Sequence, residues 1–268
     1  ILSSMTMCVL KTIHATGECF PGYHIKPSIT LPNEDFKSNI ITDRFKTNLS
    51  GTYRIELPRL GIGFTFHISK SDIYLEKESD AVIYGVYEEV EDLDFGNTLI
   101  IDGGGKSVDK SITVGGTLLA DASFTGVNSG QRLIRYIIDD YVKNTGNREP
   151  SKEAVELALQ DGYLMRGYTK EDIWDSIVNA KERIATQIYN DVLIMLDKPE
   201  LLVEDINNLL MHGRLFKNTT RDGKSISIAD LVASKIRQNN KDIKVHAILD
   251  TSTICKGSVI SRWVDEEA

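Results

Sequence analysis

The chain has 268 residues, 41% of them hydrophobic and 26% charged, which is the composition of a soluble globular protein with one large or two ordinary domains. Its formal net charge of −8 disfavours direct, sequence-independent binding to DNA phosphates. Three scattered cysteines argue against a disulfide framework and favour a cytoplasmic location, and no run approaches the roughly 18 apolar residues of a membrane-spanning helix.

The first 97 residues predict a mixture of helices and strands. Apolar residues recur at helical spacing at the start of the chain until Gly17, which is a suitable stop. Alternation of apolar and polar residues further along predicts β-structure. In chain order, the predicted elements are a helix over 1–16, a short strand over 24–32 that ends at Pro32, a polar segment over 33–50, β-structure over 52–76 and a helix over 80–92 that Ser79 and Asp80 could cap.

The rest of the chain predicts strands followed by longer helices. The segment 129–146 is strongly amphipathic and ends at Gly146. The predicted elements are strands over 98–102 and 111–124, helices over 129–146, 151–162 and 169–198, the last capped by Thr169, a mostly helical stretch over 199–241, a buried strand over 244–250 and a short helix over 256–264. This alternation predicts an α/β fold with a mixed sheet, and the composition shift near residue 97 is the predicted domain boundary.

The stretch TLIIDGGGKSVD (98–109) is the candidate site. A strand that ends in Asp102 and three glycines presents backbone N–H groups without side chains, so the turn can approach a polyphosphate closely. An acid beside phosphates requires a cation between them, which suggests Mg²⁺ and its water shell. The chain returns at once in a second strand, so the motif is neither a P-loop nor a dinucleotide fingerprint. A glycine-rich hairpin without a ligand fits the spacing equally well.

The same stretch resembles the second phosphate loop of the superfamily that joins actins, heat-shock chaperone ATPases and sugar kinases. The family pattern is D-x-G-G-x-T-x-D after an apolar strand, and the matching positions are Asp102, Gly104, Gly105, Ser107 in place of threonine, and Asp109. The neighbouring segments 71–85, 123–142 and 179–188 resemble those around this loop in plasmid-segregation actins of the ParM type. The likeness covers residues 1–32 loosely and 70–196 well.

The resemblance implies roles for individual residues. Gly103 to Gly105 would bind the β- and γ-phosphates through backbone N–H groups, and Asp102 would order Mg²⁺-bound water. Glu78, or failing that Glu76, would position the water that attacks the γ-phosphate. The other implied nucleotide contacts are Lys106, Ser107, Asp109, Gly130, Lys181 and Glu182. Hydrolysis of this kind depends mainly on positioning and charge neutralisation.

The resemblance also implies an actin-like, ribonuclease-H-like α/β fold, with mixed sheets flanked by helices in two lobes around a cleft. The implied units are a partial domain I over 1–97, domain II with the phosphate hairpin over 98–250, and a C-terminal turn and short helix over 251–268. Two features depart from the family pattern. The first phosphate loop is not found, so domain I is predicted to be incomplete; a truncated piece of an ATPase, a divergent actin that has lost turnover and a repurposed scaffold are three explanations of this absence. Asp250-Thr251-Ser252-Thr253 stands where the family has a glycine turn.

Three functions are compared. The first is an actin-like protein that polymerises with ATP or GTP and Mg²⁺, hydrolyses the nucleotide if the fold is complete, and positions plasmid or phage DNA through a separate adaptor. The second is a non-catalytic assembly or scaffold protein on the same fold, which the two departures favour. The third, a small-molecule kinase, lacks a recognisable substrate-binding aspartate motif.

Other conspicuous residues are interpreted conservatively. Trp174 and Trp263 are expected to be core or interface anchors, His246 a packed core histidine, and the acidic run 88–94 a solvated helix end. His67 and His212 belong to no nucleophile pattern, and no Gly-x-Ser-x-Gly motif supports a hydrolase triad. A metal site is disfavoured because no zinc spacing fits Cys8, His14, Cys19 and His24.

Overall fold

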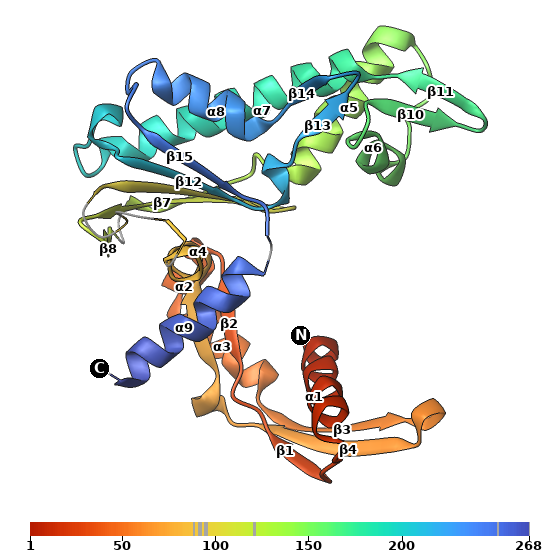
Figure 1. Ribbon diagram of the computed structural model, residues 1–268, viewed down its shortest axis with the longest axis vertical. Coiled ribbons are helices and arrows are strands. Elements are labelled where there is room, and N and C mark those ends of the chain that lie inside the picture. The colour runs from red at the N-terminus through yellow and green to blue at the C-terminus, as the bar shows by residue number, and fades with distance from the viewer. Residues whose placement is uncertain (88, 91–92, 94–95, 120–121, 251, 268) are drawn as a thin grey trace.

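The structure is a computed structural model of residues 1–268. It describes every residue except 88, 91–92, 94–95, 120–121, 251 and 268, and it does not describe the side chains of 264–267. The chain forms two lobes (Figure 1). The first lobe contains the elements up to α4 together with the last helix, α9, and the second lobe contains β6 to β15, so the chain crosses between the lobes twice.

The first lobe has two small sheets. Its elements are α1 (Leu2–Thr16), β1 (Gly22–His24), β2 (Ser28–Leu31), α2 (Asn33–Lys37), α3 (Asn39–Leu49), β3 (Gly51–Leu57), β4 (Ile62–Ile68), β5 (Tyr74–Lys77), α4 (Glu78–Val86) and α9 (Thr253–Glu267). Strands β1, β4 and β3 form one sheet, and β2 pairs with β5 in parallel. The helical spacing of Met5 and Val9 places both in the apolar core under the three-stranded sheet, and Gly17 ends α1 in the left-handed conformation.

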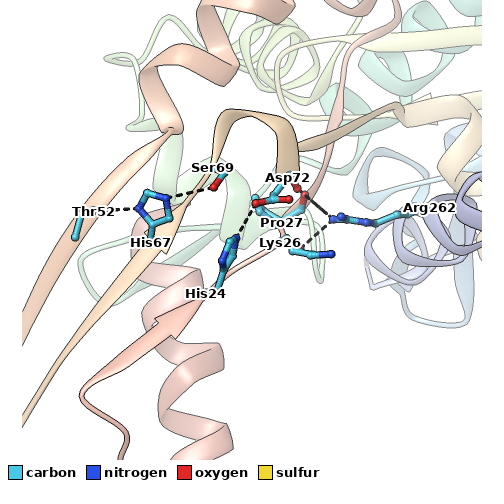
Figure 2. Close-up of polar contacts among 8 residues, drawn as sticks. All are labelled: His24, Lys26, Pro27, Thr52, His67, Ser69, Asp72 and Arg262. Atoms are coloured by element: carbon cyan, nitrogen blue, oxygen red, sulfur yellow. Dashed lines mark hydrogen bonds and ion pairs between the residues drawn. The ribbon is translucent and has the colours of Figure 1, made fainter.

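Helix α9 returns to the first lobe and is fixed there by polar contacts. Figure 2 shows Arg262, whose Nη1 donates to the carbonyl oxygens of Lys26 and Pro27 between β1 and β2, at 3.2 and 3.4 Å, and to that of Asp72 just before β5, at 3.3 Å. The Asp72 carboxylate in turn lies 2.7 Å from Nε2 of His24 on β1. These contacts join α9 to both small sheets of the lobe.

The second lobe is built on one mixed sheet. Its strands are β6 (Thr98–Gly103), β7 (Val108–Val114), β8 (Thr117–Leu118), β9 (Phe124–Gly126), β12 (Asn208–His212) and β15 (Lys244–Ile248). The order is β15-β12-β6-β7-β8, with β9 also paired to β7. Strand β12 runs parallel to both neighbours, and β6 and β7 form an antiparallel hairpin. Every residue of β6 and β12 is buried, which explains why the apolar run at 99–101 does not alternate.

Helices cover the sheet of the second lobe, as Figure 1 shows for α7 and α8. The elements are α5 (Gly130–Thr145), α6 (Lys152–Ala158), β10 (Tyr163–Arg166), β11 (Thr169–Asp172), α7 (Trp174–Asp197), β13 (Thr219–Arg221), β14 (Lys224–Ile226) and α8 (Ile228–Arg237). The amphipathic pattern of 129–146 is confirmed, because α5 buries Leu133, Ile134 and Ile137 in the main core. Among the described residues, no helix combines the length and the apolarity that crossing a bilayer requires.

Several predicted elements are wrong in type or extent. Residues 169–172 are strand β11 and not the start of a long helix; the helix begins at Trp174, whose N–H donates to Asp172 Oδ1 at 2.9 Å. The stretch 199–241 is not mostly helical, because it contains the central strand β12 and the β13–β14 hairpin. The polar segment 33–50 forms α2 and α3, and the last helix is longer than predicted. Helix α4 ends at Val86, and the acidic run 88–94 lies partly outside the described residues.

Candidate functional site

The glycine-rich stretch forms the β6–β7 hairpin that the sequence predicts. Asp102 pairs with Asp109 and Gly103 with Val108, so the turn spans 104–107. A side chain at Gly103 would lie 2.7 Å from Leu215 and Phe216, so the core itself requires glycine there. Gly105 has open space in front of its α-carbon and, with Lys106, lies exposed at the tip of the hairpin.

Hydrogen bonds fix the hairpin against the start of α5. The N–H of Gly130 donates to Gly104 O at 3.1 Å and that of Gln131 to Gly105 O at 2.9 Å. The N–H of Gly104 donates to Ser107 O at 2.9 Å and closes the turn. In this conformation the amide of Gly104 is therefore occupied, and the exposed tip at Gly105 and Lys106 is the part of the turn that faces outward.

A cavity of about 760 Å³ opens beside the hairpin. Its lining combines glycines of the hairpin and of α5, apolar side chains, basic side chains and several polar or acidic ones. The lining residues are Gly104, Gly105, Gly130, Gln131, Leu133, Ile134, Glu156, Leu159, Gln160, Lys181, Arg214, Leu215, Lys217, Asn218 and Thr219. Bare backbone, cations and apolar side chains in one cavity suit a ligand that carries both an apolar ring and an anionic tail.

Lys181 and Glu182 occupy different environments. Lys181 is buried, lines the cavity, and donates through Nζ to the carbonyl oxygens of Lys217 and Ile226 at 3.2 and 2.8 Å. Burial lowers the pKa of Lys181 to about 8. Glu182 is exposed on the next position of α7 and is not among the residues that line the cavity. The structure thus brings Lys181, but not Glu182, to the wall of this cavity.

Asp102 has a partner that the sequence patterns do not reveal. The parallel register of β6 and β12 places Asp102 opposite His212, and Oδ1 of the acid lies 2.7 Å from Nδ1 of the imidazole. The other ring nitrogen, Nε2, lies 3.0 Å from the carbonyl oxygen of Asp250. Both side chains are almost fully buried. Burial lowers the pKa of His212, but the hydrogen bond and charge of Asp102 outweigh it and the net shift is upward.

A second glycine, Gly213, approaches the β6–β7 hairpin from the end of β12. Gly213 adopts a left-handed φ of 105°, and a Cβ there would lie 2.5 Å from Gly103 O. Position 213 therefore requires glycine on both conformational and steric grounds. The resemblance places a glycine turn after the strand 244–250, where this chain has Asp250 instead. In the sheet, β12 lies between that strand, β15, and β6, so the glycine that approaches the hairpin follows β12 and not β15.

Two glutamates are candidates for the residue that positions water, and the structure places them differently. Burial, and then the negative charges of Asp102 and Asp109 on the second lobe, raise the pKa of Glu78, the first residue of α4, to about 7. Glu76 accepts hydrogen bonds from Lys77 N at 2.8 Å, from Tyr74 at 3.0 Å and from Ser261 of α9. Glu76 is thus engaged inside the first lobe, and Glu78 is the glutamate near the hairpin.

Asp109 links the two lobes beneath the hairpin. Its carboxylate accepts from Thr125 Oγ1 at 2.5 Å, from Ser107 Oγ at 3.2 Å and from the backbone N–H of Asn33 in α2 at 3.3 Å. Burial raises the pKa of Asp109, although these hydrogen bonds oppose the shift. Asn33 also accepts from Ser79 Oγ at 3.0 Å. The acid that closes the family motif is therefore a fixed part of the lobe junction.

Comparisons with known proteins identify the fold. No family model matches the chain, and no curated protein is significantly similar to it. Ta0583, an archaeal actin homologue, superposes with a TM-score of 0.69 at 15% identity, over 97% of this chain and 76% of that one. A ParM filament from Clostridium botulinum gives a TM-score of 0.64 at 11% identity over 88% and 66%, and Bacillus thuringiensis ParM with ATP gives 0.60 at 13% over 100% and 74%. The chain has the actin-like fold.

This confirms the predicted actin-like architecture, with mixed sheets flanked by helices in two lobes. The charges of Asp102 and Asp109 act on Glu78 of the first lobe, whereas the cavity is lined by second-lobe residues that include none of these three acids. Trp263 is 62% exposed on α9 and is therefore not a core residue. Among the residues that the structure describes, His, Cys, Asp and Glu form no group of three or more that could hold a metal, so Cys8, His14, Cys19 and His24 make no such site.

Proposed function

We propose that the protein is an actin-like nucleotide-binding protein that assembles with copies of itself into filaments. The observation that carries the proposal is that the Gly104–Gly105 turn lines a cavity of about 760 Å³ together with apolar side chains and with Lys181, Arg214 and Lys217. These are the features that a nucleoside polyphosphate needs: bare backbone and cations for the phosphates, and an apolar surface for the base. ATP and GTP are the proposed ligands.

Mg²⁺ is the proposed metal. The carboxylates of Asp102, Glu78 and Asp109 influence each other electrostatically, and oxygen donors are what Mg²⁺ prefers. Because no group of three such side chains among the described residues is arranged to hold a metal directly, Asp102 would contact the ion through water, with the nucleotide's phosphates supplying other oxygens. Bound there, Mg²⁺ neutralises phosphate charge.

Hydrolysis is proposed to depend on Glu78 and Asp102. A carboxylate whose pKa is near 7 can accept a proton from water at physiological pH, and Glu78 meets this condition. Asp102 would hold the metal's water shell, and the stretch from Gly103 to Ser107, with Gly105 and Lys106 at its exposed tip, would contact the terminal phosphates. Gly130 and Lys181 would contact the rest of the nucleotide. Glu182 does not line the cavity, so it would contact the nucleotide only after a movement of the lobes or of α7.

Filament formation and DNA segregation are proposed by analogy with the similar structures. The Clostridium botulinum ParM and Alp12 structures are filaments, Ta0583 has been solved with ADP and Bacillus thuringiensis ParM with ATP. A cytoplasmic filament with a net charge of −8 would contact plasmid or phage DNA through a separate adaptor. Residues 1–97, 98–250 and 251–268 remain the proposed domain I, domain II and C-terminal units.

The test combines calorimetry, light scattering and phosphate release. We expect ATP or GTP with Mg²⁺ to bind, to raise scattering and to release phosphate, and we expect Asp102→Ala to abolish phosphate release. Asp197→Ala, at an exposed acid that ends α7 and does not line the cavity, is the control. The alternative is a non-catalytic assembly protein, which the occupied amide of Gly104 favours. Scattering that rises without nucleotide, in a protein that binds none, would establish that alternative.

A further inference from the structure

His212 contacts two parts of the second lobe, the end of β6 and the point where the chain crosses to the first lobe. On one side it contacts Asp102 near the end of β6. On the other it contacts the backbone of Asp250, where the chain leaves β15 and crosses to α9 in the first lobe (Figure 1). This crossing is one of two between the lobes, so it must bend in any lobe movement.

The turn at the crossing is built to hold its shape. Both carboxylate oxygens of Asp250 accept hydrogen bonds from Ser252, from N–H at 2.9 Å and from Oγ at 2.7 Å. The carbonyl oxygen of Asp250 accepts from Thr253 N at 3.3 Å at the start of α9, as well as from His212. A shift of α9 therefore changes the position of the same carbonyl that His212 contacts.

The hydrogen-bonding pattern fixes the direction of the contact to Asp250. A carbonyl oxygen only accepts, so Nε2 of His212 carries a proton and donates to Asp250. If Asp102 is ionised, Nδ1 donates as well and the imidazole is charged; if Nδ1 is bare, the shared proton sits on Asp102. In either case a proton bridges the two side chains, and the contact orients the carboxylate through Oδ1 alone. Among the described residues, Oδ2 accepts no hydrogen bond, which leaves it for the water shell of a metal.

We infer that His212 is a positioning residue that connects the inter-lobe turn at Asp250 to Asp102, so that lobe closure and the orientation of Asp102 are coupled. The inference rests on the proposed function, because Asp102 has a role only if nucleotide binds beside it. It adds to that function a physical connection through which opening or closure of the lobes changes the orientation of the Asp102 carboxylate. The neighbouring backbone supports the route, since Gly213 N donates to Ile248 O at 3.1 Å and ties the ends of β12 and β15.

Two isosteric variants separate the two contacts. His212→Asn places an amide near the position of Nδ1, so it keeps a donor for Asp102 and loses the contact to Asp250. His212→Gln places an amide near the position of Nε2, so it keeps the contact to Asp250 and loses the contact to Asp102. His246→Asn and His246→Gln, on the adjacent strand β15, are matched controls away from the hairpin.

The measurements are phosphate release and amide hydrogen exchange over residues 249–256, with and without Mg²⁺ and ATP or GTP. We expect His212→Gln to lower kcat about 10- to 100-fold with KM within about threefold, because a misplaced acid slows the reaction without weakening binding. We expect His212→Asn to lose the nucleotide-induced change in exchange while keeping more of kcat than His212→Gln. Equal effects of both variants on both measurements, or no effect of either, would overturn the inference.

Two further results keep the test decisive. If a His212 variant does not fold, as judged by circular dichroism, Asp250→Ala replaces it, because this change removes both hydrogen bonds to Ser252 and leaves the carbonyl in place. We expect Asp250→Ala to weaken the nucleotide-induced change in exchange, and an unchanged response contradicts the inference. Wild-type protein that binds no nucleotide overturns the proposed function and the inference together, whereas nucleotide binding with His212 variants that match the wild type overturns the inference alone.

Discussion

Glu78, the first residue of α4 in the first lobe, lies within electrostatic influence of Asp102, near the end of β6 in the second lobe. Burial and the charges of Asp102 and Asp109 raise the pKa of Glu78 from its ordinary 4.5 to about 7. The two acids come from different lobes, so the packing of the lobes brings them together. Their repulsion is unfavourable, and a cation or a proton between the lobes would relieve it.

The first prediction concerns the pH dependence of stability at Glu78. An acid with a raised folded-state pKa contributes stability that is fully present below its unfolded pKa, near 4.5, and is lost as pH rises through about 7. Glu78→Gln stays neutral and removes this loss. We therefore expect Glu78→Gln to exceed the wild type in unfolding free energy by roughly 1–3 kcal/mol at pH 8 in urea unfolding, and to be nearly equal to it at about pH 4, below the unfolded pKa of Glu78.

Glu182→Gln is the control for this prediction, because Glu182 is exposed on α7 and should not change the pH profile. If the unfolding free energies of the wild type and of Glu78→Gln change in parallel from pH 5 to pH 8, the assigned environment of Glu78 is wrong. The same variant should lose phosphate release if the proposed function holds, so stability and activity are expected to change in opposite directions.

The second prediction concerns a buried ion pair behind the hairpin. Lys110 on β7 is fully buried, its Nζ lies 2.9 Å from Asp191 Oδ2 on α7, and it stands 5.0 Å from the ring centre of Phe124. Burial lowers the pKa of Lys110, while Asp191 opposes the shift. Asp191→Leu removes the carboxylate that compensates this buried cation, so we expect a loss of about 3–5 kcal/mol in unfolding free energy.

The double variant Lys110→Met with Asp191→Leu is the informative control. Replacing both charges with apolar side chains of similar size should restore most of the lost stability, because no uncompensated charge remains at this pair. A double-mutant cycle in urea measures the coupling between the two positions. If the double variant is as unstable as the sum of the singles, the pair does not interact as the structure indicates.

The sequence predicted the parts of the fold that depend on local patterns. The strand-turn-strand motif at 98–109 is confirmed because three glycines and an apolar run define a hairpin locally, and α5 is confirmed because Leu133, Ile134 and Ile137 recur at helical spacing. The predicted start of α7 is wrong because Thr169 and Asp172 resemble a helix cap, yet they belong to a β-hairpin whose partner is 163–166.

The site was less predictable, since its key contacts join distant segments. His212 meets Asp102 only because β12 pairs in parallel with β6, and pairing between strands separated by more than a hundred residues leaves no local signal. The one available clue was the short apolar run 209–211 followed by Gly213, which is typical of a buried strand and a tight turn. It was obscured by the surrounding polar residues that suggested helices.

The third prediction tests the turn at Gly213. A Cβ at this position would lie 2.5 Å from Gly103 O, and the φ of 105° is unfavourable for any other residue. Gly213→Ala should therefore destabilise the protein by more than about 1 kcal/mol and displace the hairpin. Gly105→Ala is the control, since a Cβ added there would meet no other atom within 4 Å. Equal melting temperatures for Gly213→Ala and the wild type would contradict the close approach.

The fourth prediction concerns the attachment of α9 to the first lobe. Arg262 donates to the carbonyl oxygens of Lys26, Pro27 and Asp72, and the substitution Arg262→Gln shortens the side chain and removes its charge (Figure 2). Hydrogen bonds from a charged donor contribute about 1.5–3 kcal/mol at most, and Arg262 is half-buried, so we expect Arg262→Gln to lower the unfolding free energy by roughly 1–2 kcal/mol.

Hydrogen exchange distinguishes a local effect of Arg262→Gln from a general loss of stability. If Arg262 holds α9 against the lobe, exchange should rise in 253–263 and around residues 26–28 and 72, while the strands of the second lobe keep their protection. Arg54→Gln, at an exposed position on β3, is the matched control. Uniformly faster exchange in both lobes would show that Arg262 acts on the whole fold, and unchanged exchange at α9 would show that the other contacts of the helix, such as that of Ser261 with Glu76, hold it without Arg262.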